Sequence, residues 1–252
     1  MLVPVAASSR RQELRALDRR HVRLLLVAGF ALAAHFATWT TALQLTSVAS
    51  ATALVCLQVG FVVLIGRWRG ERVSRAVLLG LGVAFGGVLV VSGVDVTIST
   101  EALTGDLLAL AGALFAAVYT WTGSDLRRTL STTAYTTVCY GICALVLLAA
   151  CLGGGQALSG YATDDWVKLG AVAVSAQLLG HSIFNHLLAT TSPTVLSLVL
   201  LLEVPGAALL AAAFLGQAPP VGVYCGLMLI VVGLGLVVST RRIPPPVEAG
   251  VD

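Results

Sequence analysis

Glu203 is the residue whose position is hardest to explain by packing alone, because it lies near the middle of the apolar run Val195–Leu215. The run is long enough to cross a bilayer, and a carboxyl group at the bilayer centre costs about 2.5–3.5 kcal/mol on insertion scales. We therefore expect Glu203 to face a cavity or a polar partner. It could carry a coupling proton that it gains and loses with substrate occupancy. Alternatively, a protonated Glu203 could hydrogen-bond a neighbouring backbone and hold the helices together.

Three polar residues, Gln177, His181 and Asn185, recur at intervals of four within another apolar run, Val167–Leu188. Residues four apart lie on one face of an α-helix. Because polar groups are costly against lipid, we expect this face to point into the bundle. The three side chains would then bind a polar substrate, or they would form interhelical hydrogen bonds worth about 0.6 kcal/mol each.

Gln58, Trp39 and Tyr119 complete the set of residues that we expect to contact a substrate. Gln58 lies in mid-span, whereas Trp39 and Tyr119 lie nearer the ends of their spans, where aromatic residues often anchor a chain at the membrane interface. Tyr119 could also gate a cavity. The sequence has no Cys pair with metal-ligand spacing, no phosphate-binding loop and no HExxH or GxSxG motif. We expect no metal, no cofactor and no enzyme activity.

Composition predicts the elements that must position these residues. Charged residues make up 11% of the chain, against about 25% in soluble domains, while hydrophobic residues make up 58% and the mean hydropathy is +0.94. Unbroken apolar runs in lipid form helices rather than barrel strands. The predicted fold class is all-α, a polytopic membrane helix bundle. Its eight predicted spans are Val22–Ala42, Ala49–Ile65, Ala76–Ser92, Leu107–Trp121, Ala134–Leu152, Val167–Leu188, Val195–Leu215 and Val221–Val238.

The placement of charge predicts how the spans are oriented. Every Lys and Arg except Lys168 lies in alternate connections, and the intervening loops are predicted to hold the acidic residues Asp95, Glu101, Asp106, Asp164 and Asp165. The positive-inside rule then places both termini in the cytoplasm of a multi-pass protein of the inner (plasma) membrane. The net charge of +3 reflects this bias, and no basic patch interleaves with aromatics, which excludes a nucleic-acid partner.

The sequence also contains an internal repeat. Thr46-Ser47 matches Thr191-Ser192, and in the same register Gln58 falls opposite Glu203; the later matches are Gly80 with Gly226 and Gly87 with Gly233. The predicted topology makes the two copies inverted, which is typical of transporters with a midplane substrate site. Chance similarity between apolar helices is the alternative. We predict an incomplete first repeat at 1–95, a complete second repeat at 105–242 and a disordered cytoplasmic tail at 243–252.

Several short segments occur in an order that points to a known family. They are Ala42-Leu43 with Thr46-Ser47, then Gly70-Glu71, Gly105-Asp106-Leu107, Thr191-Ser192-Pro193 and Leu202-Glu203. Together they resemble the EamA type of the drug/metabolite transporter superfamily, from about Leu2 to Arg242. The resemblance implies ten spans, so that this chain lacks the first two, and the absent first span would line the central cavity. Val204 between Glu203 and Pro205, and Gln217 after Gly216, depart from the family pattern.

These observations predict a secondary transporter that works by alternating access. We expect it to export a small neutral or amphipathic metabolite or drug, with proton coupling through Glu203. No Lys or Arg is embedded in a predicted span, which argues against phosphate-bearing substrates. The expected partners are the lipid bilayer, a small-molecule substrate and a second copy in a homodimer. The alternative is a non-transporting or incomplete membrane protein that acts as the partner of another chain.

Overall fold

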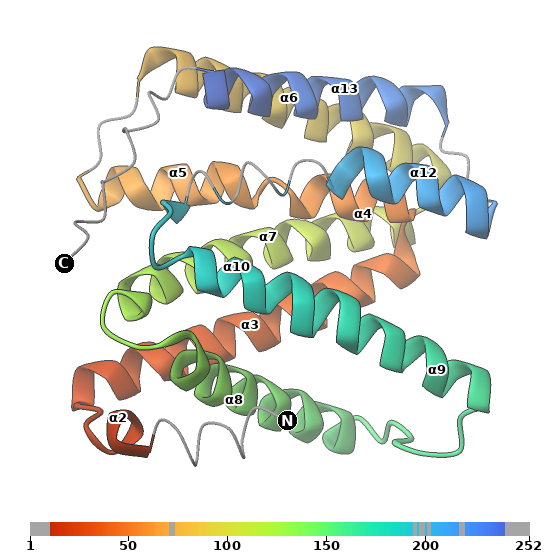
Figure 1. Ribbon diagram of the computed structural model, residues 1–252. Coiled ribbons are helices and arrows are strands. Elements are labelled where there is room, and N and C mark those ends of the chain that lie inside the picture. Colours follow the sequence, from red (N-terminus) through yellow and green to blue (C-terminus); the bar gives the residue numbers. More distant parts are fainter. Residues whose placement is uncertain are drawn as a thin grey trace.

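The computed structural model describes residues 11–70, 74–193, 196, 200, 203–216 and 220–239, and those residues contain helices and no strand (Figure 1). The predicted tail at 243–252 and most of the run before Glu203 lie outside the described residues. The helices are α2 (Arg11–Arg15), α3 (Arg19–Leu45), α4 (Val48–Val55), α5 (Gln58–Trp68), α6 (Arg75–Ile98), α7 (Thr100–Arg127), α8 (Thr132–Gly153), α9 (Thr163–Val172), the π-helix η1 (Ala173–His181), α10 (Ser182–Leu187), α12 (Glu203–Leu215) and α13 (Val221–Ser239).

The helical bundle agrees with the predicted fold class. Five helical stretches are long and apolar enough to cross a membrane: Arg19–Leu45, Val48–Trp68, Thr100–Arg127, Thr132–Gly153 and Thr163–Leu187. The stretches Arg75–Gly87 of α6 and Val221–Gly233 of α13 are apolar as well. Each predicted span therefore overlaps a helix, although the seventh is described as a helix only from Glu203 onward. The number eight stays a prediction.

Polar residues at the helix starts explain where several helices begin. The side chains of Asp18, Ser47, Ser99 and Ser131 each accept a hydrogen bond from a backbone N–H in the first turn of the helix that follows. Ser99 alone connects α6 to α7. The prediction of an acidic loop here was wrong, because α7 begins at Thr100 and includes Asp106, which is 1% exposed. The helix continues beyond its apolar core, so hydropathy alone places its start too late.

Two antiparallel helix pairs form the frame of the bundle. In the first, α7 lies along α3, and a β-carbon placed on Gly105 would lie 3.0 Å from the Cβ of Leu45. In the second, α6 lies along α13 (Figure 1). A β-carbon on Gly87 would lie 2.5 Å from the carbonyl oxygen of Gly226, and one on Gly233 would lie 2.4 Å from that of Gly80. Such close approach requires glycine at both crossings.

Candidate functional site

A buried chain of hydrogen bonds joins three helices in the interior of the bundle. The hydroxyl of Tyr119 on α7 donates to Oδ1 of Asn185 on α10 at 2.7 Å. Nδ2 of Asn185 in turn donates to the hydroxyl of Tyr140 on α8 at 2.9 Å. Asn185 is completely buried and Tyr119 is 3% exposed. Since every amide and hydroxyl group here has a partner, the chain fixes the relative positions of α7, α8 and α10.

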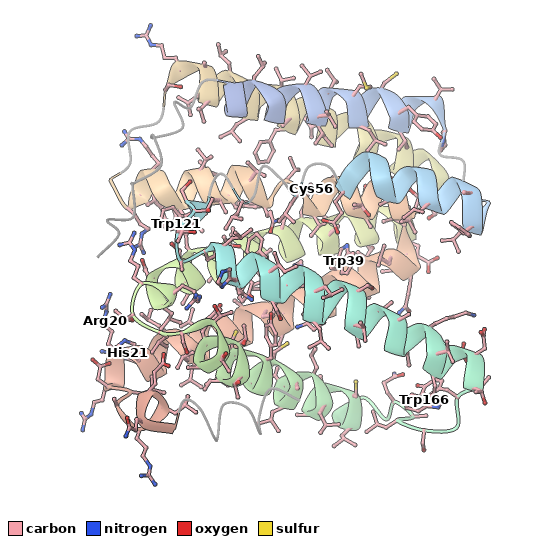
Figure 2. The ribbon with its side chains drawn as sticks, viewed as in Figure 1. Arg20, His21, Trp39, Cys56, Trp121 and Trp166 are labelled. Carbon is pink, nitrogen blue, oxygen red and sulfur yellow. The ribbon has the colours of Figure 1, made fainter. Side chains whose placement is uncertain are left out.

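Aromatic and imidazole rings extend from Tyr119 to Trp39. The ring of Tyr119 lies 6.2 Å from that of His181, which meets Phe36 edge-on at 5.3 Å. Phe36 lies beside His35 at 5.2 Å, and His35 stacks on Trp39 at 6.1 Å with 3° between the planes. Figure 2 shows Trp39 inside the bundle. We call these residues, together with Asn185 and Tyr140, the central cluster.

Two nitrogen atoms of the central cluster are buried without a hydrogen-bond partner among the described residues. They are Nε1 of Trp39 and Nδ1 of His181. His35 differs, because its Nδ1 lies 3.0 Å from the carbonyl oxygen of Gly112 on α7. Buried polar atoms in proteins are nearly always hydrogen-bonded, so an unpaired one calls for an explanation such as an unseen bound molecule. The indole N–H can only donate, whereas a neutral imidazole nitrogen can donate or accept.

The predicted polar stripe on the sixth span is only partly brought together. His181 and Asn185 join the central cluster, whereas no contact of the Gln177 side chain with it is seen. The local backbone also departs from the α-helix that the spacing assumed, because Ala173–His181 forms a π-helix.

Gln58 and Glu203 are each the first described residue of a helix. Gln58 is the first residue of α5, after the break at Cys56 and Leu57 that separates it from α4. Glu203 is the first residue of α12. Gln58 is 8% exposed, but Glu203 is exposed rather than enclosed by the described residues. Neither residue contacts the central cluster, although the Cys56 thiol reaches the carbonyl oxygen of Leu200 at 3.6 Å.

Pro205 occupies the third position of α12. Pro205 therefore lies in the first turn of the described helix. The first four N–H groups of a helix have no partner within it, so a proline in this turn removes no hydrogen bond.

One end of the bundle is held by arginines of the basic connections. Arg69 forms an ion pair with Asp125 at 2.9 Å, and its guanidinium lies 4.9 Å from the centre of the Trp121 ring. Nε1 of Trp121 donates to the carbonyl oxygen of Val62 at 2.9 Å. The side chain of Trp121 is therefore buried inside the bundle (Figure 2).

Arg127 lies closer to the central cluster than the sequence indicated. It is 8% exposed at the end of α7, and its Nε donates to the backbone carbonyl of Asn185 at 2.9 Å. The sequence placed Arg127 in a connection because the apolar run ends at Trp121. Its reach back to α10, like the inward positions of Phe36 and Tyr140, depends on tertiary packing that no local pattern encodes.

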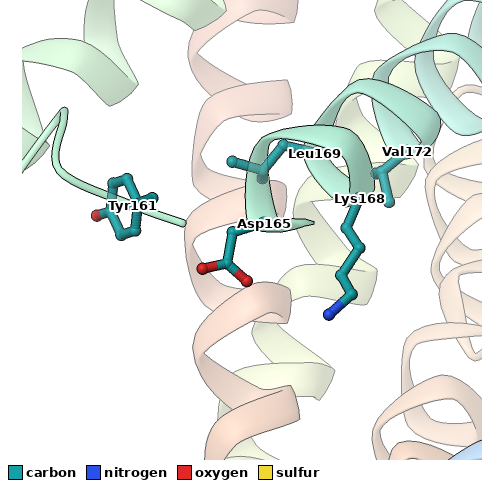
Figure 3. A pocket seen from close by; sticks show the side chains of 5 residues that line it. All are labelled: Tyr161, Asp165, Lys168, Leu169 and Val172. Atoms are coloured by element: carbon teal, nitrogen blue, oxygen red, sulfur yellow. The ribbon is translucent and has the colours of Figure 1, made fainter. Parts of the chain in front are cut away.

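An open hollow on the surface lies away from this site. It is lined by Tyr161, just before α9, and by Asp165, Lys168, Leu169 and Val172 along α9 (Figure 3). None of these residues belongs to the central cluster, and we assign the hollow no role. Among the described residues no group of His, Cys, Asp and Glu could hold a metal ion.

Comparison with known proteins settles the family. The model of the EamA-like transporter family matches residues 1–93 and 103–239, which is most of the chain. The chain belongs to the EamA-like transporter family. It is accordingly a multi-pass membrane protein of the transporter type found in the drug/metabolite transporter superfamily. The family match points to a transporter rather than an enzyme.

The fold also occurs among solved structures. One crystal structure of a protein aligns with this chain at a TM-score of 0.65 and 19% sequence identity. The alignment covers 92% of this chain and 80% of the chain in that structure. At that identity the likeness shows the fold alone. No curated protein matches the chain.

Proposed function

We propose that this EamA-like chain is a secondary transporter that exports a small neutral or amphipathic metabolite or drug across the inner (plasma) membrane. The observation that carries the proposal is the central cluster, a group of buried and half-buried polar and aromatic side chains inside an apolar bundle. Clusters of this kind are costly in a membrane unless they serve a pathway or a site.

The side chains of the central cluster indicate the kind of molecule that would bind. The cluster contains ring faces and neutral hydrogen-bonding groups and no carboxylate, ammonium or guanidinium group. Flat apolar surface on the substrate would pack against Phe36, His35 and Trp39. A hydrogen-bond acceptor on the substrate would satisfy Nε1 of Trp39, and His181 would supply a donor or an acceptor according to its tautomer. The guanidinium of Arg127 lies outside the central cluster and donates to the backbone carbonyls of Asn185 and Leu130.

Two inverted repeats are the basis proposed for alternating access. In the repeat, Gly80 corresponds to Gly226 and Gly87 corresponds to Gly233. The contact between Gly87 and Gly226 therefore has a symmetry equivalent, the contact between Gly233 and Gly80. Both contacts are present. This is the pattern that a two-fold axis between antiparallel α6 and α13 produces. The two stretches matched by the family model, 1–93 and 103–239, support the same division.

The moving part in this proposal is the segment α9–η1–α10. No residue of α9 or η1 is buried. In contrast, α3 packs along α7, from the contact at Gly105 near the start of α7 to the hydrogen bond of His21 with Thr129, just after its end. Regions with few buried contacts open at lower free-energy cost than the rest of a fold. Displacing α10 would break the bonds of Asn185 to Tyr119 and Tyr140 and expose the central cluster.

Glu203 is the proposed site of proton coupling, with its repeat counterpart Gln58 as the neutral equivalent. Gln58 lies at a helix start within a span, and interrupted helices commonly form transporter sites. A carboxyl group at the exposed start of α12 is accessible to a proton. Both termini are proposed to be cytoplasmic, because the basic connections lie at the end of the bundle held by Arg69 and Arg127.

The proposal is tested by comparing metabolites exported from cells with and without the protein, followed by transport of the candidate into proteoliposomes. Trp39→Phe removes the unpaired indole N–H and should lower transport by at least ten-fold. Trp166→Phe makes the same change at the exposed start of α9, away from Trp39 (Figure 2), and should leave transport unchanged. No exported compound, or equal transport by both variants, would contradict the proposal.

A further inference from the structure

The start of α3 gathers arginines whose charge is not paired within the described part of the chain. Six arginines occur between Arg10 and Arg23. The described side chains among them belong to Arg15, Arg19, Arg20 and Arg23, and all four are exposed. None of the four forms an ion pair with a described carboxylate. Figure 2 shows Arg20 on the outer side of the bundle.

The two carboxylates of the same segment are held by other groups. Oδ1 of Asp18 accepts a hydrogen bond from the backbone N–H of His21 at 2.8 Å and lies 2.8 Å from Nδ1 of the same residue. The carboxylate of Glu13 accepts hydrogen bonds from the backbone N–H of Ser131 and, at 2.7 Å, from its hydroxyl. The arginines are therefore available to an anion from outside the chain.

Two of these arginines share a helical face with exposed apolar side chains. The residues of this face, which we call the outer face of α3, are Arg19, Arg23, Leu26 and Phe30. Their spacing of three or four residues places them on one side of an α-helix. Leu26 is 42% exposed and Phe30 is 54% exposed. Nε of Arg23 donates to the backbone carbonyl of Arg19 at 3.4 Å, so the guanidinium of Arg23 points back toward the start of the helix.

The opposite face of α3 is the one packed inside the bundle. Leu25, Ala28 and Leu32 are buried there. A β-carbon on Gly29 would lie 2.6 Å from the Cβ of Ile142 on α8. Since α3 is long and apolar enough to cross a membrane, its outer face is the one that it presents to lipid.

We propose that the outer face of α3 binds an anionic phospholipid. The headgroup phosphate would lie between the guanidinium groups of Arg19 and Arg23, and an acyl chain would lie along Leu26 and Phe30. Guanidinium groups bind phosphate oxygens through paired, charge-assisted hydrogen bonds. Clusters of basic residues at the end of a transmembrane helix attract anionic lipids.

Two features of the outer face select this ligand. The apolar strip beyond Arg23 favours a lipid over a soluble phosphate, because only a lipid has a chain to cover Leu26 and Phe30. Arg20 adds a further positive charge next to Arg19, which would repel the ammonium group of a zwitterionic headgroup. The inference goes beyond the proposed function and does not depend on the substrate or on transport.

Native mass spectrometry of the purified full chain in detergent tests the proposal. The protein is titrated with dioleoyl phosphatidylglycerol and, separately, with dioleoyl phosphatidylcholine. The Kd for the anionic lipid should be at least ten-fold lower. The double variant Arg19→Gln, Arg23→Gln should lose this preference. The matched control is Arg67→Gln, Arg75→Gln, which removes two exposed arginines from the end of α5 and the start of α6 and should keep it.

A second variant separates the apolar part of the site from the charge. Phe30→Ala leaves every charge in place and should weaken the binding of phosphatidylglycerol several-fold. Equal Kd values of the wild type for the two lipids would overturn the proposal. An equal loss of preference in both double variants would also overturn it, because the attraction would then come from net charge alone. Displacement of phosphatidylglycerol by the same concentration of glycerol 3-phosphate would likewise overturn it, because the ligand would then be a soluble phosphate.

Discussion

The crossing of α6 and α13 makes a sharp prediction, because two adjacent glycines on α6 differ completely in their surroundings. A β-carbon on Gly87 would lie 2.5 Å from the carbonyl oxygen of Gly226 and 2.8 Å from the backbone nitrogen of Ile230. A β-carbon on Gly86 would have no atom within 4 Å. Gly87→Ala should therefore force the helices apart, while Gly86→Ala should be accommodated.

The expected magnitude follows from the size of the overlap. Ordinary contacts begin near 3.4 Å, so α6 and α13 must separate by roughly 1 Å, and both obstructing atoms belong to backbone that cannot rotate away. Overpacking of this kind costs about 1–3 kcal/mol. Both variants gain the same helix propensity, up to about 1 kcal/mol, when glycine becomes alanine. The difference in the free energy of unfolding between the two variants should thus be about 1–3 kcal/mol.

The assay is reversible unfolding in mixed micelles, with sodium dodecyl sulfate as the denaturant and tryptophan fluorescence as the signal. Gly233→Ala and Gly235→Ala form a second matched pair on α13, since Gly233 meets backbone at 2.4 Å and Gly235 meets nothing. The two pairs should show similar differences, because the repeat makes the contacts equivalent. Equal stability of Gly87→Ala and Gly86→Ala would refute the close crossing.

Three further predictions concern charged groups. Glu203→Gln should abolish proton-driven accumulation in proteoliposomes, while Glu101→Gln should preserve it; accumulation that still depends on pH in Glu203→Gln would exclude Glu203 as the coupling residue. Arg69→Gln should lower the free energy of unfolding by about 1 kcal/mol, since a half-exposed ion pair and a cation–π contact are lost, and an unchanged stability would contradict this. Hydrogen bonds from His21, first from its backbone N–H, lower the pKa of Asp18 below its ordinary value of 3.8. The stabilisation of the α3 start by this cap should be fully present above pH 3.8 and lost as the pH falls through the lower folded value. Amide exchange at His21 measures it, and protection that persists in Asp18→Ala would argue against the cap.

Hydropathy predicted the helical class well, because each span must satisfy its own backbone hydrogen bonds in lipid. The position of a helix start depends instead on capping residues. Ser99 sets the start of α7 at Thr100, so that Asp106 is helical and buried where a loop was expected. An apolar run marks the part of a helix that lies in hydrocarbon, and the helix continues past it.

The candidate site was less predictable, since it depends on contacts between distant parts of the chain. Polarity within an apolar run was enough to identify His181 and Asn185. Phe36 and Tyr140 belong to the central cluster through the packing of α3 and α8, and nothing in their local sequence separates them from other aromatic residues. The π-helix at Ala173–His181 likewise has no sequence signal that we recognise.

Transport by Tyr119→Phe tests the central claim, that the central cluster is the substrate site, most directly. The variant removes one hydroxyl group, the donor to Asn185, and leaves the aromatic ring in place. Tyr161→Phe makes the same change on the exposed surface and is the matched control. With the compound found in the export comparison, Tyr119→Phe should raise KM at least five-fold in proteoliposomes while Tyr161→Phe matches the wild type. Equal KM values for all three proteins would contradict the assignment of the central cluster as the substrate site.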